Sequence, residues 1–169
     1  MTDTRDRVAA HVREDPGVHF NAVVRATDLA PGQVQYHARR LVRAGDLAVE
    51  RVAGRTHYFP PEYGDWERGV VALARRETAR DALYYLLDEG PSRPADVADG
   101  VGVARSTLEH HLDELTDRDV VDKRRDERNR VTLELARPEA TARLLAAVDP
   151  SAADRFVDRF ERLLDDLLE

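Results

Sequence analysis

The chain has 169 residues, of which 42% are hydrophobic and 35% charged, and its formal net charge is −7. This length allows one medium domain or two small ones. The absence of cysteine excludes a disulfide framework, thiolate metal ligands and a thiol nucleophile. No apolar run approaches the roughly 18 residues that a membrane helix needs, and the first residues are charged, unlike a signal peptide. We therefore expect a cytoplasmic protein that does not bind membranes.

Residues 1–62 predict three helices followed by a β-hairpin. The helices are expected over residues 5–14, 20–28 and 31–44, and the strands over residues 47–52 and 56–59. Pro31 suits the first turn of the third helix, and Gly45 suits its C-terminal cap. Val34, Ala38 and Leu41 recur at helical spacing and mark its buried face. This order of elements is that of a winged helix, a form of helix-turn-helix.

The rest of the chain predicts a second set of the same elements. Residues 63–75 are expected to form a linker helix, and residues 76–136 a second winged helix. Its helices are predicted over residues 76–89, 95–100 and 105–118, and its strands over residues 120–125 and 130–135. Residues 137–169 predict two further helices, broken near Asp149-Pro150.

The last predicted helix has an apolar stripe at helical spacing: Phe156, Phe160, Leu163, Leu164 and Leu167. Two interpretations are open. The stripe could pack onto its own domain, or it could pair with a second copy of the chain. We favour a homodimer, because the apolar surface is large for one small domain to cover.

An internal repeat underlies this organisation. Residues 8–47 align without a gap onto residues 82–121, at an offset of 74 positions. The identical positions are Val23/Val97, Ala30/Ala104, His37/His111 and Leu41/Leu115. The pattern of apolar positions matches between the two segments at more places than the identical residues do. The order of the predicted elements is also the same. We therefore expect a duplicated domain.

The segments PGQVQYHARRLVRAGDL and ARSTLEHHLDELTDRDVV resemble the recognition-helix regions of ArsR/MarR-type winged-helix regulators. In tandem they resemble the double winged-helix transcription regulators of haloarchaea, over roughly residues 5–136. The single lysine, the 25 arginines and the absence of isoleucine also resemble proteins of salt-loving archaea. The resemblance implies a mainly α fold with small β-wings: two tandem winged helix-turn-helix domains plus C-terminal helices. It also implies a regulator that binds double-stranded DNA.

The two predicted recognition helices carry opposite charges. Between Pro31 and Gly45 there are three arginines and no acid, and the face opposite the buried stripe carries Tyr36, Arg39, Arg40 and Arg43. Gln33 and Gln35 flank this face near the N-terminus of the helix, where base edges are usually contacted. Arg51 and Arg55 lie on the hairpin. We expect these eight residues to bind DNA.

In the second copy, acids replace the three arginines: Asp113, Glu114 and Asp117. Phosphates would be repelled from such a face. The second hairpin carries five bases: Lys123, Arg124, Arg125, Arg128 and Arg130. We expect this wing to contact the DNA backbone, or the second domain to bind a protein partner. The alternative for the whole chain is an interaction adaptor in chromosome segregation or the transcription machinery, where tandem winged helices bind protein.

The sequence gives little support for catalysis or metal binding. The chain has no Gly-rich phosphate loop, no G-x-S-x-G and no H-E-x-x-H, so we expect no enzyme activity and no cofactor. His110 and Glu114 stand four residues apart and could supply two metal ligands. No third ligand is identifiable from the spacing, so we expect no metal site.

Overall fold

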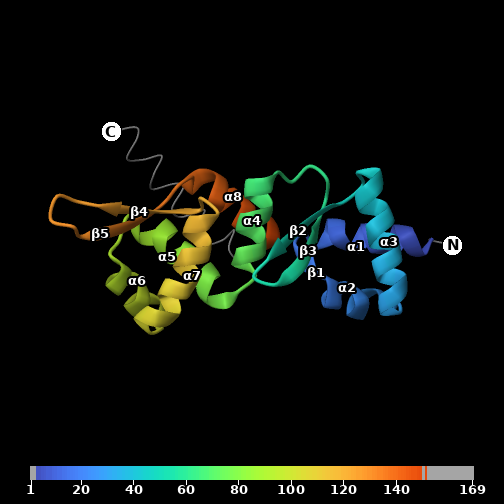
Figure 1. The fold of residues 1–169 in the computed structure, drawn as a ribbon, viewed down its shortest axis with the longest axis horizontal. Coiled ribbons are helices and arrows are strands. Elements are labelled where there is room, and N and C mark those ends of the chain that lie inside the picture. The colour runs from blue at the N-terminus through green and yellow to red at the C-terminus, as the bar shows by residue number, and fades with distance from the viewer. Residues whose placement is uncertain (1–2, 150, 152–169) are drawn as a thin grey trace. The chain divides into compact units, whose positions relative to one another are not determined.

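The computed structural model describes residues 3–149 and 151 and divides the chain into two compact units, residues 1–72 and 73–169. Each unit contains three helices followed by a two-stranded hairpin, so the fold is mainly α with small β-wings, as predicted (Figure 1). Within the described ranges, no helix combines the length and the apolar character needed to span a membrane.

Unit 1 contains three helices and a three-stranded antiparallel sheet. The elements are α1 (Thr4–Glu14), β1 (Val18–His19), α2 (Phe20–Thr27), α3 (Pro31–Ala44), β2 (Ala48–Val52) and β3 (Arg55–Phe59). The strand order is β1-β3-β2, in which Tyr58 of β3 pairs with Val18 on one side and Val49 on the other. Helix α4 (Asp65–Ala74) follows and crosses the boundary between the units.

The core of unit 1 is aliphatic. Buried valines and leucines from the three helices and from β1 form it, among them Val12, Val23, Val34 and Leu41. Each such side chain contributes about 1.5–3 kcal/mol when it leaves water. This burial holds α3 against α1 by the face that carries Val34, Ala38 and Leu41, and it leaves the opposite face of α3 in solvent.

Unit 2 repeats the pattern with α5 (Glu77–Glu89), α6 (Pro94–Val101), α7 (Arg105–Asp117), β4 (Val121–Arg125) and β5 (Val131–Leu135). Helix α8 (Pro138–Val148) then buries Leu144 and Leu145. Helices α5 and α6 approach closely at Gly100, where a Cβ would lie 2.2 Å from the ring of Tyr85. Only glycine fits this position without a movement of that ring.

The two units share their unusual backbone positions. Asp28 and Gly102, 74 residues apart, both adopt the left-handed conformation after the second helix, with φ of 53° and 81°. Gly45 and Asp119, also 74 residues apart, adopt it after the third helix, with φ of 78° and 56°. Turns of the same kind therefore follow corresponding helices in both units.

The predicted elements are found with small differences at their ends. The third helix has the predicted bounds, and the other helices and strands begin or end within one or two residues of their predicted limits. The sequence analysis missed β1, because two residues between Gly17 and a helix give no periodic pattern. The predicted apolar stripe at Phe156, Phe160, Leu163, Leu164 and Leu167 lies outside the described residues.

Candidate nucleic-acid interface

An open groove of about 1020 Å³ lies in unit 1 between α3, the start of α2 and the β2–β3 hairpin. Five arginines line it: Arg25, Arg39, Arg43, Arg51 and Arg55. The lining residues include no aspartate and no glutamate. The groove is therefore a strongly cationic surface in a protein whose net charge is −7.

Helix α3 forms one wall of the groove through a single stripe. Gly32, Gln35, Arg39 and Arg43 recur at intervals of three or four residues, so they lie on one side of the helix. Arg39 also affects the pKa of Tyr58, which lines the same groove. Burial raises the pKa of the Tyr58 hydroxyl, and the positive charge of Arg39 partly opposes this rise.

The hairpin forms the other wall. Because side chains alternate along a strand, every second residue of a strand faces the same side. Val49 and Arg51 of β2 face the groove, opposite Tyr58 and Thr56 of β3. Glu50, the one acid within the two strands, lies between them in sequence and does not line the groove. Because neighbouring side chains of a strand point to opposite faces, the Glu50 carboxylate does not lie on the cationic surface.

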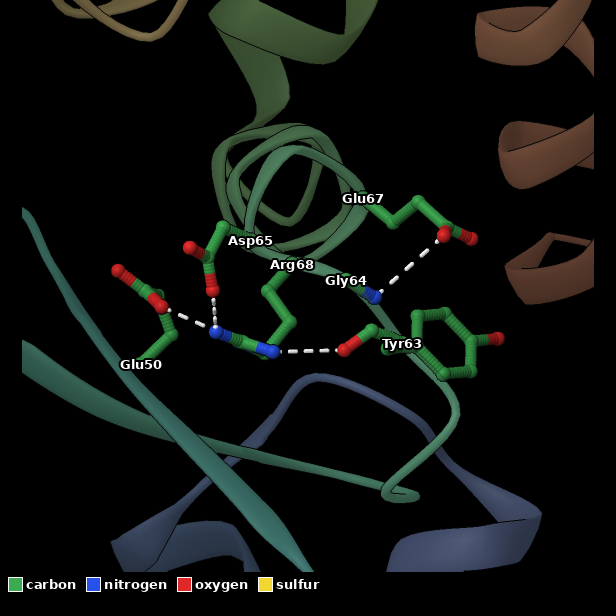
Figure 2. A network of polar contacts seen from close by, with 6 residues as sticks. All are labelled: Glu50, Tyr63, Gly64, Asp65, Glu67 and Arg68. Atoms are coloured by element: carbon green, nitrogen blue, oxygen red, sulfur yellow. Dashed lines mark hydrogen bonds and ion pairs between the residues drawn. The ribbon is translucent and has the colours of Figure 1, made fainter.

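Arg68 of α4 neutralises Glu50 on the other side of the hairpin (Figure 2). Its Nε donates to Glu50 Oε2 at 3.1 Å, and one terminal nitrogen donates to the Tyr63 carbonyl at 2.6 Å. The other terminal nitrogen pairs with Asp65. Both Arg68 and Glu50 are mostly buried, so this network fixes the start of α4 to β2.

Three predicted DNA-binding residues on α3 lie outside the groove. Gln33 caps the helix, because its Oε1 accepts a hydrogen bond from Ala30 N at 3.2 Å. Ala30 has no side-chain acceptor, so only half of a capping box forms. Tyr36 and Arg40 instead form a pair of their own, in which Arg40 Nη1 donates to the Tyr36 hydroxyl at 2.9 Å.

The sequence analysis missed Arg25, which reaches the groove from α2. Asn21 lines the groove one helical turn earlier, and His19 caps the N-terminus of α2 by accepting from Ala22 N at 3.0 Å. The only sequence signal was the i, i+4 spacing of Asn21 and Arg25 on a short helix. Packing of α2 against α3 brings them to the groove.

In unit 2, Glu109, Asp113 and Glu114 of α7 pair with bases of the same unit. Lys123 Nζ lies 3.1 Å from Glu109 Oε2 and 3.8 Å from Asp113 Oδ1. Arg105 also pairs with Glu109, and Arg76 pairs with Glu114. Burial acts to raise the pKa of Glu109, but hydrogen bonds from Lys123 and Arg105 hold it below its ordinary value.

Most bases of the second wing are also engaged. Arg124 pairs with Glu134, and Arg130 Nε donates to Asp126 Oδ2 at 2.7 Å. Asp126 further accepts from the backbone N–H groups of Arg130 and Arg128, and these bonds lower its pKa. Arg125 donates to Asn129 Oδ1 at 3.2 Å. Over the described part of the chain, only Arg125 and Arg128 of these five bases have no carboxylate partner.

The histidines do not form a recognisable metal centre. His110 Nε2 lies 3.9 Å from Glu114 Oε1, but Glu114 also pairs with Arg76. In residues 3–149 and 151, no group of three or more His, Asp or Glu side chains is placed to hold a metal ion. His111, the neighbour of His110, is buried, whereas His37 at the corresponding position of α3 is half-buried.

Comparison with known proteins gives one family match. Residues 2–71 match a family model described as an N-terminal HTH domain, a range that coincides with unit 1. Unit 1 is therefore a helix-turn-helix domain of the winged form. No curated protein matches the chain. The haloarchaeal origin and the ArsR/MarR subtype stay predictions.

The solved structures that match the chain are only distantly similar to it. Overoxidized AbfR bound to DNA is 15% identical, with 80% of this chain and 93% of that chain covered and a TM-score of 0.39. Disulfide-formed AbfR is 16% identical, with coverages of 80% and 88% and a TM-score of 0.38. The DIP2311 protein from Corynebacterium diphtheriae is 16% identical, with coverages of 78% and 26% and a TM-score of 0.31.

Proposed function

We propose that this protein is a sequence-specific DNA-binding regulator of transcription and that unit 1 reads the DNA. The observation that carries the proposal is the groove between α3 and the hairpin, which five arginines line without an acid. Its location in a helix-turn-helix domain supports the same function, because the third helix of such a domain is the element that enters the major groove.

The groove residues suit different parts of a duplex. Gln35 lies near the N-terminus of α3, and its amide can donate to and accept from the edge of an adenine. Arg39 and Arg43 face the hairpin wall and neutralise phosphates beside the major groove. Arg51 and Arg55 on the hairpin contact the backbone of the same strand or the adjacent minor groove. Arg25 adds a further phosphate contact from α2.

Unit 2 has a different role in this proposal. The face of α7 that corresponds to the DNA-reading face of α3 carries Asp113, Glu114 and Asp117, which repel phosphates. Because Lys123, Arg124 and Arg130 are engaged within the unit, any contact of this wing with DNA falls to Arg125 and Arg128 at its tip. The acidic α7 face favours a second candidate function for unit 2, the binding of a protein partner.

The proposed regulator is a homodimer formed through the C-terminal apolar stripe. Symmetric dimers of helix-turn-helix proteins bind two half-sites about one turn of DNA apart, so we expect a pseudo-palindromic operator. The stripe from Phe156 to Leu167 in the sequence supports this part of the proposal.

Matched double variants of the two recognition helices test the proposal. Arg39→Ala/Arg43→Ala removes two charges from α3, and Asp113→Ala/Asp117→Ala changes the corresponding positions of α7. Each lost contact costs about 1–3 kcal/mol, so the arginine variant should bind DNA at least about 30-fold more weakly. Its plot of log affinity against log salt should also lose about two units of slope.

The measurement is fluorescence anisotropy of the full chain with a duplex selected from a random library, at several salt concentrations. The aspartate variant should bind with unchanged or slightly higher affinity. Equal losses in both variants would contradict the assignment of reading to unit 1. Absence of any selected sequence would favour the protein-binding adaptor.

A further inference from the structure

Among the described residues of unit 1, Tyr36 is the most exposed large hydrophobic residue, with 55% of its surface accessible. At 100° per residue, it lies roughly opposite the buried stripe of Val34, Ala38 and Leu41. It is therefore on the part of α3 farthest from the core. A phenol ring at this place has an apolar face and a hydroxyl that are both available for contacts outside the core.

Arg40, one turn later, is held by this ring. The guanidinium carbon lies 5.6 Å from the ring centroid of Tyr36, within the range of a cation–π interaction. The same guanidinium donates to the Tyr36 hydroxyl at 2.9 Å. His37 packs edge-on against Tyr36, with ring centroids 5.1 Å apart. The guanidinium is thus restrained by a cation–π contact and by a hydrogen bond on an exposed helix surface.

This restraint leaves most of the guanidinium donors available. Arg40 has five N–H donors and uses one of them on Tyr36. Arg40 has no carboxylate partner in the part of the chain that the structure describes. Within residues 3–149 and 151, no cation–π contact of this kind is made by the groove arginines Arg39 and Arg43. Two kinds of arginine therefore occur on α3: unsupported ones that face the hairpin, and a supported one on the outward face.

The difference matters because phosphates and bases impose different requirements. A phosphate is attracted by positive charge at many orientations, whereas the O6 and N7 atoms of guanine require a planar guanidinium at one orientation. A side chain held in place before binding loses less conformational freedom when it makes such a paired contact.

We propose that the Tyr36–Arg40 pair is a guanine-reading element, in which Arg40 contacts the base and Tyr36 is a positioning residue. This inference rests on the proposed DNA-binding function and assigns the selection of a G·C pair to the outward face of α3. Arg39 and Arg43 then supply affinity for the backbone, and Arg40 supplies selection of a G·C pair.

The test uses variants of the full chain that keep the net charge. Tyr36→Leu removes the ring, Tyr36→Phe keeps the ring but removes the hydroxyl, and Arg40→Lys keeps the charge but removes the planar donors. His110→Leu is the matched control, because His110 occupies the corresponding position of α7. Circular dichroism melting checks that each variant is folded, as expected for exposed positions.

Each protein is offered a random duplex library, and its binding is then measured on the selected duplex with each G·C pair changed in turn. Tyr36→Leu and Arg40→Lys should each lose preference for the same G·C pair by about tenfold, with an unchanged salt slope. Tyr36→Phe should keep part of the preference. The combination Tyr36→Leu/Arg40→Lys should lose little more than either change alone, because the two residues act as one unit.

Full preference for every G·C pair in both Tyr36→Leu and Arg40→Lys would overturn the inference. A similar loss of preference in His110→Leu would overturn it as well. The Arg39→Ala/Arg43→Ala protein separates this failure from failure of the proposed function. If that variant binds DNA weakly while both Tyr36→Leu and Arg40→Lys retain their preference, only the guanine-reading role is wrong. If it binds DNA as the parent does, the proposed function itself is wrong.

Discussion

At the scale of single residues, His111 of α7 is a buried titratable group. Its Nδ1 has no hydrogen-bond partner within residues 3–149 and 151. Burial lowers the pKa of the imidazole below its ordinary value of 6.5, and the charge of Arg76 lowers it further, while Glu114 acts in the opposite direction. His111 is therefore neutral in the folded protein near pH 7.

This lowered pKa predicts a loss of stability on mild acidification. Below about pH 6.5 the histidine of the unfolded chain takes up a proton that the folded chain does not, so the free energy of unfolding falls as the pH decreases. His111→Leu should remove this pH-dependent loss of stability. The free energy of unfolding of the variant, relative to that of the parent, should therefore rise as the pH falls from 6.5 to 5.

Urea unfolding of both proteins at several pH values measures the effect. The lowered pKa values of Glu109, Asp126 and Asp149 act only below their ordinary values of 4.5 and 3.8, so they do not interfere in this window. A constant difference between the two proteins from pH 7.5 to pH 5 would show that His111 does not titrate differently on folding.

At the scale of elements, the turns that follow the helices determine where each helix stops. Gly102 adopts φ of 81° at the end of α6, and a Cβ there would meet no atom within 4 Å. The cost of Gly102→Ala is therefore a backbone cost, about 1 kcal/mol or more, since alanine is strained in the left-handed region. Gly102→Asp should cost less, because Asp28 adopts the same conformation at the corresponding position.

Gly32 provides a control of opposite sign. It lies in the first turn of α3, and a Cβ there also meets no atom within 4 Å. Gly32→Ala should stabilise unit 1 by about 0.5–1 kcal/mol, because alanine favours the helix. Thermal unfolding of both variants checks the pair of predictions. Destabilisation by Gly32→Ala would mean that α3 requires glycine for packing.

Sequence patterns predicted the elements better than the contacts of the site. The spacing of Val34, Ala38 and Leu41, with Pro31 and Gly45 at the ends, is local information, and it placed α3 correctly. The groove depends on side chains from α2, α3 and the hairpin, so the spacing of Asn21 and Arg25 on α2 could not by itself place Arg25 in it. Charge counts on the second wing likewise could not reveal that Lys123 reaches back to the acids of α7.

At the scale of the whole molecule, the net charge of −7 includes two repeats that carry different charge. Residues 1–62 have nine bases and eight acids, whereas residues 76–136 have ten bases and fifteen acids. The first repeat concentrates its bases in one groove and keeps Glu50 away from it. The second repeat pairs several of its bases with its own acids. In the proposed function, the distribution of charge, and not its sum, is therefore the reason why unit 1 would attract DNA.

The proposed dimer predicts that affinity for a two-part operator depends on the C-terminal stripe. Leu163→Glu/Leu167→Glu introduces two carboxylates where the sequence predicts an apolar interface, and each would lose solvation on burial. The parent should sediment as a dimer and this variant as a monomer. Asp165→Asn/Asp166→Asn, on the predicted polar face of the same segment, is the control and should remain dimeric.

DNA binding gives a second measurement of the same prediction. On a duplex with one half-site, the Leu163→Glu/Leu167→Glu protein should bind as the parent does, because the groove of unit 1 is intact. On a duplex with two half-sites, it should lose the gain that linked sites provide, which is commonly about a hundredfold or more. A dimeric variant, or a monomeric parent that already distinguishes the two duplexes, would show that the stripe does not join two copies.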